Sequence, residues 1–76
     1  MFYFEGIVDN NGKRFPLSKT YCNLIISNDS TVDIFVYDEN NYIGRIKAGE
    51  TIEFRGYQAN NLEIKGNNAN IRFWAW

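Results

Sequence analysis

The sequence has no histidine and only one cysteine among its 76 residues. Histidine is the usual general base near neutral pH and a common nitrogen ligand of zinc and copper. The single cysteine, Cys22, has neither a second cysteine for a disulfide nor a histidine to activate it as a nucleophile. These absences remove most hydrolytic and metal-dependent sites, so we expect no cofactor and no bound metal. We interpret Cys22 as a small core residue.

The sequence also lacks a surplus of charge and any long apolar run. Eight Lys and Arg against nine Asp and Glu give a net charge of −1, without the basic excess that supports binding to nucleic acid. The apolar runs are too short to cross a bilayer, and no positively charged leader precedes an apolar segment. We therefore expect a cytoplasmically made protein that binds neither nucleic acid nor membrane.

The length fits one domain, residues 1–76, and the content of 45% hydrophobic and 17% aromatic residues is that of a folded chain. Surface scaling gives hydrophobic burial on the order of 120 kcal/mol, against roughly 115 kcal/mol of conformational entropy. Because these terms nearly cancel and no disulfide or metal adds to them, we expect association with copies of the chain or with a larger protein scaffold.

Turn-forming residues divide the chain at near-regular intervals. Nine of the eleven asparagines, including four Asn-Asn pairs, fall with aspartate, glycine and serine in the turn-like segments 9–12, 28–30, 38–41, 47–49, 56–61 and 66–68. Such spacing, with Ile, Val, Phe, Tyr and Thr between the turns, is typical of antiparallel β proteins. We predict an all-β fold, a small antiparallel β-sandwich or jelly-roll-like barrel of about seven to eight short strands.

Apolar and polar residues alternate along the expected strands, which predicts one core-facing side for each strand. The residues on this side are Val32, Ile34, Val36, Ile52, Phe54, Leu62, Ile64, Ala69, Ile71, Phe73 and Ala75. Phe2, Phe4 and Ile7 indicate a first strand. The unbroken run Leu24-Ile25-Ile26 predicts a middle strand, and Pro16 confines the segment 13–17 to a sheet edge.

Four aromatic residues fall on the side that alternation turns toward solvent. These are Phe35 and Tyr37 on one expected strand, and Trp74 and Trp76 on the last. Exposed aromatic clusters on small soluble domains mark partner surfaces, and Trp and Tyr are enriched where interfaces concentrate their energy. We predict that these four residues form a protein interface; the alternative is a thin domain whose own loops cover both sheet faces.

Other functions need other residues to come together. Sugar-binding surfaces stack rings on sugar faces, and Tyr37, Tyr42, Tyr57 and Trp74 beside asparagines make a carbohydrate-binding module the main alternative. A hydrolase would need Glu53 and Glu63 as a pair, although their alternation beside Arg55, Lys65 and Arg72 favours surface ion pairs. A calcium site would need Asp29, Asp33, Asp38 and Glu39, which match no established calcium-binding loop. We expect no enzyme.

The order of segments in residues 21–76 resembles a recurring type of small virion protein from tailed bacteriophages. The matching segments are Ile26-Ser27-Asn28-Asp29-Ser30, Val32-Asp33-Ile34-Phe35-Val36, Ala48-Gly49-Glu50 before Ile52-Glu53-Phe54, and Ala69-Asn70-Ile71-Arg72 before the terminal aromatics. The resemblance implies a β-sandwich or jelly roll that serves in the virion as a capsid cement, decoration or other structural accessory, often as a trimer.

Overall fold

The computed structural model describes residues 1–18 and 20–76, which form eight β-strands. The strands are β1 (Phe2–Val8), β2 (Lys13–Pro16), β3 (Asn23–Asn28), β4 (Ile34–Asp38), β5 (Asn41–Ile46), β6 (Thr51–Arg55), β7 (Asn61–Gly66) and β8 (Ala69–Ala75). The described residues include no helix of the length and hydropathy that crossing a membrane requires. The prediction of an all-β fold is confirmed.

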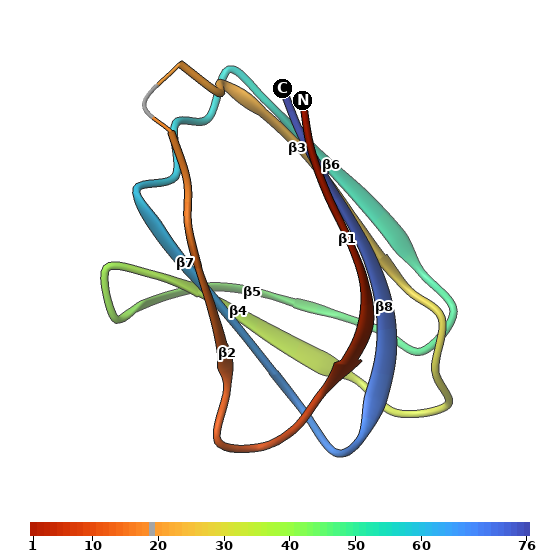
Figure 1. Cartoon of the computed structure of the whole chain (residues 1–76). Coiled ribbons are helices and arrows are strands. Elements are labelled where there is room, and N and C mark those ends of the chain that lie inside the picture. The colour runs from red at the N-terminus through yellow and green to blue at the C-terminus, as the bar shows by residue number, and fades with distance from the viewer. Residues whose placement is uncertain (19) are drawn as a thin grey trace.

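The strands form two four-stranded antiparallel sheets. The first sheet has the order β1-β8-β3-β6, and the second has the order β2-β7-β4-β5. Figure 1 shows β1 and β8 lying side by side, with the two ends of the chain adjacent at the top of the view. As predicted, β3 is a middle strand and β2, which contains Pro16, is an edge strand.

The pairing of the strands describes one long hairpin rolled into two layers. β4 pairs with β5, β3 with β6, β2 with β7, and β1 with β8. Successive pairs along this hairpin alternate between the two sheets. This is the arrangement of a jelly roll, which contains eight strands in two facing sheets.

The core lies between the inward sides of the two sheets. Phe73 and Phe15 are buried, and their ring centroids are 5.1 Å apart. Because Phe73 belongs to the first sheet and Phe15 to the second, this contact joins the layers. Phe2 and Phe4 pack against Phe15 with centroid distances of 6.1 and 5.0 Å. The core-facing sides predicted from alternation are confirmed, with Val32, Ile52 and Phe54 partly buried at its margin.

Two residues near the ends of strands differ from the sequence-based expectation. Cys22 is exposed, so its prediction as a core residue is wrong. It precedes β3, beyond the last core layer, where its N–H donates to the carbonyl of Trp76 over 2.9 Å. Ile7 lies in the predicted first strand but is 61% exposed, because Val8 occupies the inward position of β1.

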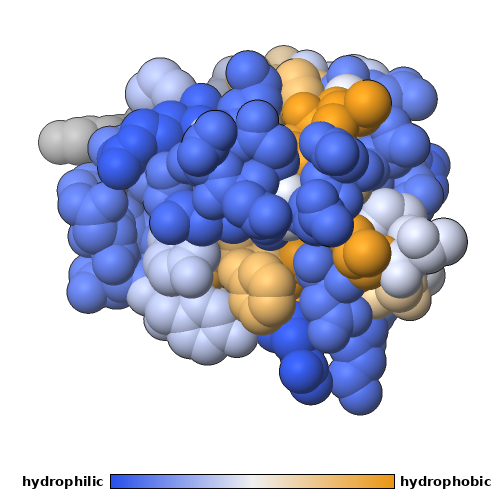
Figure 2. Space-filling model, turned by 90° about the horizontal axis from the view of Figure 1, so that it is seen from below, coloured by the Kyte–Doolittle hydropathy of each residue, from blue (hydrophilic) through white to orange (hydrophobic). Residues whose placement is uncertain are grey.

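Two of the asparagine-rich turns lie at one end of the sandwich. The turns after β1 and after β7 are both at the bottom of Figure 1. Figure 2, which views the molecule from below, shows a mostly hydrophilic surface at this end.

Candidate functional site

The outer face of the first sheet carries two cross-strand rows of side chains. One row contains Glu5, Arg72, Ser27 and Thr51, which are opposite one another on β1, β8, β3 and β6. The next row contains Tyr3, Trp74, Ile25 and Glu53 in the same strand order. A mainly polar row therefore runs beside a row with two aromatic rings and an isoleucine.

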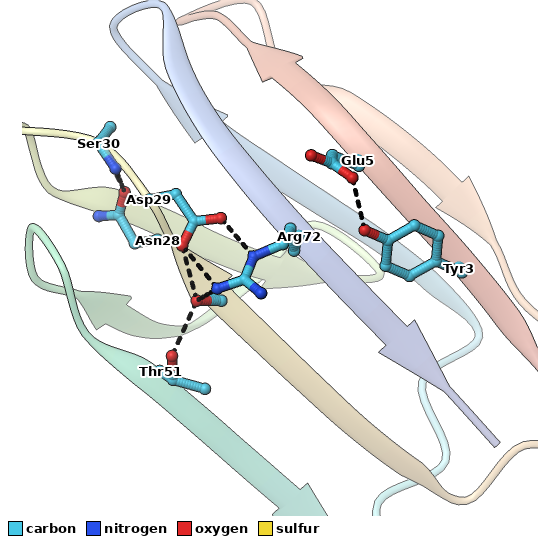
Figure 3. Close-up of polar contacts among 8 residues, drawn as sticks. Tyr3, Glu5, Asn28, Asp29, Ser30, Thr51 and Arg72 are labelled. Carbon is cyan, nitrogen blue, oxygen red and sulfur yellow. Dashed lines mark hydrogen bonds and ion pairs between the residues drawn. The ribbon is translucent and has the colours of Figure 1, made fainter.

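Asp29 fixes the central arginine of the polar row (Figure 3). Arg72 Nε donates to Asp29 Oδ2 over 2.6 Å, and Arg72 Nη2 donates to Asp29 Oδ1 over 3.0 Å. Ser27 Oγ also donates to Asp29 Oδ1 over 3.0 Å and lies 2.8 Å from Thr51 Oγ1. A guanidinium held by two charge-assisted hydrogen bonds is oriented as well as charged, so Arg72 presents a defined edge to the face.

These contacts shift the ionisation of both partners. The hydrogen bond from Arg72 lowers the pKa of Asp29, and the bond from Ser27 acts in the same direction. The same pair raises the pKa of the Arg72 guanidinium. On β1, Tyr3 Oη donates to Glu5 Oε1 over 2.7 Å, and this bond raises the pKa of the phenol. Asp29 and Arg72 therefore compensate each other's charge at the centre of this face.

An open groove of about 550 Å³ runs over this face. Its apolar lining comes from Met1, Ile25, Trp74 and Trp76, and its polar lining comes from Ser27, Thr51 and Arg72. Cavities of this volume lie within the size range of ligand pockets. Because the groove is a shallow surface feature with a mainly apolar lining, it suits the side chains of a partner better than an enclosed small molecule.

The two tryptophans differ in how they are held. The Trp74 ring has its centroid 5.3 Å from that of Tyr3, and Arg72 Cζ lies over it at 5.4 Å. Trp76 is 37% exposed. Its backbone, however, is tied to β3 by the N–H of Asn23, which donates to the Trp76 carbonyl over 2.9 Å. The backbone beside the groove is therefore fixed while one indole remains accessible.

The structure separates the four predicted interface residues into two pairs. Trp74 and Trp76 lie at the groove on the first sheet, whereas Phe35 and Tyr37 lie on β4 and face outward from the second sheet. Phe35 is 38% exposed, and Lys65 Nζ lies 5.0 Å from the centroid of the half-buried Tyr37 ring. Because the two pairs lie on opposite faces of the sandwich, a single flat partner surface cannot contact both of them.

The rings proposed for sugar binding are also dispersed. Tyr37 and Tyr42 form an edge-to-face pair at 60°, and Trp74 is on the opposite sheet. Tyr57 packs on Phe54, and its hydroxyl donates to Asp38 Oδ2 over 2.9 Å. Burial, together with this bond, raises the pKa of Tyr57. These four rings do not form the coplanar platform on which a sugar would stack.

The two glutamates considered for catalysis lie on different sheets. Glu53 on β6 pairs with Arg55, whereas Glu63 on β7 lies 3.6 Å from Arg14 and 4.0 Å from Lys65. Both residues form ion pairs; that of Glu63 with Arg14 joins two strands, whereas Glu53 pairs with Arg55 of its own strand. Because the sheets face away from each other on their outer sides, these two carboxylates do not flank a common substrate position.

The acidic residues considered for calcium do not come together in one metal-ligating group, and three of the four are engaged by other partners. Asp29 bonds Arg72, Asp33 lies 3.7 Å from Arg45, and Asp38 accepts hydrogen bonds from the N–H groups of Asn60 and Asn61. In residues 1–18 and 20–76, no group of three or more Cys, Asp or Glu side chains is placed to hold a metal ion.

Sequence reasoning missed five of the seven residues that line the groove, namely Met1, Ile25, Ser27, Thr51 and Arg72. Alternation from Trp74 places Arg72 on the same side of β8, and this signal was available. Tyr3, Ile25 and Ser27 become neighbours of Trp74 and Arg72 only through the registers of β1 and β3 against β8. Those registers are set by the rolled topology, which local patterns do not specify.

Comparisons of this chain with protein-family models, with curated proteins and with solved structures find no match.

Proposed function

We propose that this protein is a non-enzymatic structural module that binds another protein through the groove on the first sheet. The observation that carries the proposal is the grouping of Trp74, Trp76, Ile25 and Met1 around one open groove beside the fixed Arg72. Aromatic anchors with an oriented arginine are the side chains most enriched at binding hot spots. Small domains also gain stability when a partner covers such a surface.

The fold favours no single function. Jelly rolls occur in viral capsid domains and in lectins. The choice between a protein partner and a sugar partner must therefore be inferred from the residues of the site. The ring of Trp74 at the groove is paired with that of Tyr3 beside it, and the two rings are tilted by 48° to each other. This tilt favours the side chains of a protein over a flat sugar face. The proposal extends, on the resemblance in residues 21–76, to an accessory component of a phage virion.

The experiment uses the fact that both tryptophans of the chain lie at the groove. A chain labelled with 5-fluorotryptophan gives one fluorine NMR signal for each indole, free of signals from an added protein. We would titrate it with the purified products of the flanking genes. Binding should shift both signals, and Trp74→Ala and Trp76→Ala should each weaken the affinity about 30-fold, as hot-spot truncations of about 2 kcal/mol do.

The matched control is Phe35→Ala, which truncates an exposed aromatic on the second sheet. Its affinity should stay within about threefold of the parent chain, as for a residue outside the interface. Loss of binding in this variant, with the tryptophan variants unaffected, would place the interface on the second sheet and contradict the proposal. If soluble glycans shift the fluorine signals and none of the proteins does, a lectin function would replace the proposal.

A further inference from the structure

The four edge strands of the sandwich differ in how they are protected against pairing with another chain. Natural edges are blocked by proline, by lysine, by bulges, by shortness or by charge. β2 has only four residues and contains Lys13 and Pro16. β5 carries a bulge, because Val36 is opposite Gly44 while Tyr37 is opposite Tyr42. β6 has five residues and carries Glu53 and Arg55.

β1 lacks most of these protections. It is the longest edge strand, with seven residues, and it contains no lysine, arginine or proline. Its register with β8 is continuous from Phe2 to Val8. Tyr3 and Ile7 are 46% and 61% exposed on its outer side, and Glu5 between them is its only charged residue. No described strand covers its outer edge.

The hydrogen-bond pattern identifies which backbone groups β1 leaves free. Trp76 and Asn23 exchange N–H to carbonyl bonds of 2.9 and 3.0 Å, so the backbone groups of Trp76 point toward β3. The directions of the backbone N–H and carbonyl groups alternate along a strand. Those of Phe73 therefore point toward β1, where Phe73 is paired with Phe4. The N–H and carbonyl groups of Tyr3, Glu5 and Ile7 therefore point to the open edge.

Charge selects among the ways in which two such edges can pair. A two-fold axis at Glu5 would place the two Glu5 carboxylates directly opposite each other, which is destabilising. An axis at Phe4 instead places Tyr3 of each copy opposite Glu5 of the other, and Ile7 of each copy opposite Met1 of the other. Every free backbone group of Tyr3, Glu5 and Ile7 then has a partner, and no like charges are opposed.

We propose that β1 pairs antiparallel with β1 of a second copy of this chain, about a two-fold axis at Phe4. The two first sheets then form one continuous eight-stranded sheet, built from two copies of four strands. This inference goes beyond the proposed function, because it concerns the edge of β1 and does not require the groove to bind a partner. It also predicts a closed dimer rather than a trimer or an open fibre.

Sedimentation equilibrium of the intact chain tests the pairing. The expected mass is twice the 8.9 kDa of one chain. Glu5→Pro removes an N–H that β8 does not use, so the monomer should keep its fold while the dimer loses two hydrogen bonds. The dissociation constant should rise about tenfold or more, from the worth of those bonds.

The matched control is Glu53→Pro on the edge strand β6. Asn28 donates its N–H to the carbonyl of Glu50, so alternation turns the N–H of Glu53 toward the free edge of β6. This variant makes the same change on an edge that the proposal leaves unpaired, and its dimer should be as strong as that of the parent. Circular dichroism confirms that both variants are folded.

An isotope-filtered NOE spectrum of mixed labelled and unlabelled chains tests the register. An axis at Phe4 brings the two Phe4 α-protons together, whereas an axis at Glu5 would bring Phe4 close to Gly6 of the other copy. The proposal is overturned by a monomer at concentrations up to about 1 mM, by a trimer, or by a dimer that Glu5→Pro leaves intact. A dimer lost only in Trp74→Ala or Trp76→Ala would also overturn it and assign self-association to the groove.

Discussion

At the scale of single residues, the pair of Asp29 and Arg72 sets the polar character of the groove. Asp29 follows β3, and Arg72 lies in the middle of β8, so the contact ties a loop to the sheet. The backbone supports it, because the N–H of Asp29 donates to the carbonyl of Asn70 over 2.9 Å. Neighbouring Asn28 is fully buried and donates to the carbonyls of Val32 and Ile46, which holds the same loop from inside.

The lowered pKa of Asp29 predicts a pH dependence of stability. A carboxylate whose pKa is lower in the folded state contributes fully above its unfolded pKa of about 4, and that contribution is lost as the pH falls through the folded value. The parent chain should therefore lose more stability than Asp29→Asn between about pH 5 and pH 2. Urea unfolding at a series of pH values measures this difference.

Arg72→Gln is the matched partner variant, because it removes the main cause of the shift. It should flatten the same part of the pH profile. Profiles of both variants that run parallel to that of the parent chain would show that the pair contributes nothing to folding. The effect should be modest, since both side chains are more than a third exposed to solvent.

At the scale of elements, the turn between β4 and β5 imposes a strained backbone on a glutamate. Glu39 and Asn40 have φ angles of 51° and 66°. Two consecutive positive φ values are those of a type I′ turn, the connection whose twist matches two-residue hairpins. Asparagine tolerates this conformation well, whereas glutamate does not. Glu39 therefore sits in the less suitable of the two positions.

Replacing the glutamate should stabilise this hairpin. Glu39→Asn is expected to raise the free energy of unfolding by about 0.5–1 kcal/mol, because it relieves the left-handed strain without changing the turn. Thermal unfolding followed by circular dichroism measures the gain. Glu39→Ala is the control, since it removes the same charge but places at positive φ a residue that, unlike asparagine, tolerates this conformation poorly. An equal gain in both variants would trace the effect to charge and not to the backbone.

At the scale of the whole molecule, stability depends on aromatic contacts between the layers, in which Phe73, Phe2 and Phe4 of the first sheet pack against Phe15 of the second. Phe73 is fully buried in the first sheet and contacts Phe15 of the second, with Phe2 at a centroid distance of 5.6 Å. A domain of this size has little reserve, because the burial that it can achieve is limited by its surface. Loss of this contact should therefore weaken both sheets together.

Phe73→Ala should cost about 3–5 kcal/mol through lost burial and the cavity left behind. This is a large part of the roughly 5–15 kcal/mol typical of folded domains. Chemical unfolding measured by circular dichroism and by tryptophan emission should give one shared, strongly shifted transition. Phe35→Ala removes the same ring from the outer face and should cost about 1 kcal/mol or less. Separate transitions for the two probes would contradict a single cooperative core.

The sequence by itself determined the all-β class, the turns, the sides of the strands and the edge position of β2. These features follow from local chemistry: asparagine and glycine accept turn conformations, alternation places Ile71 and Phe73 inward, and Pro16 cannot donate to a ladder. Local patterns also pointed to Trp74 and Trp76 as outward residues, and both line the groove.

Only the tertiary structure decided which of these residues share a surface. Phe35 and Trp74 have the same pattern in sequence, yet they lie on different sheets, because each step along the rolled hairpin moves the chain to the other layer. Tyr3 lies beside Trp74 through a pairing that joins the two ends of the chain. The groove, and the position of β1 at an open edge, depend on the pairing of segments far apart in sequence. Local alternation fixes which side of a strand faces the core, but not which strand lies beside it.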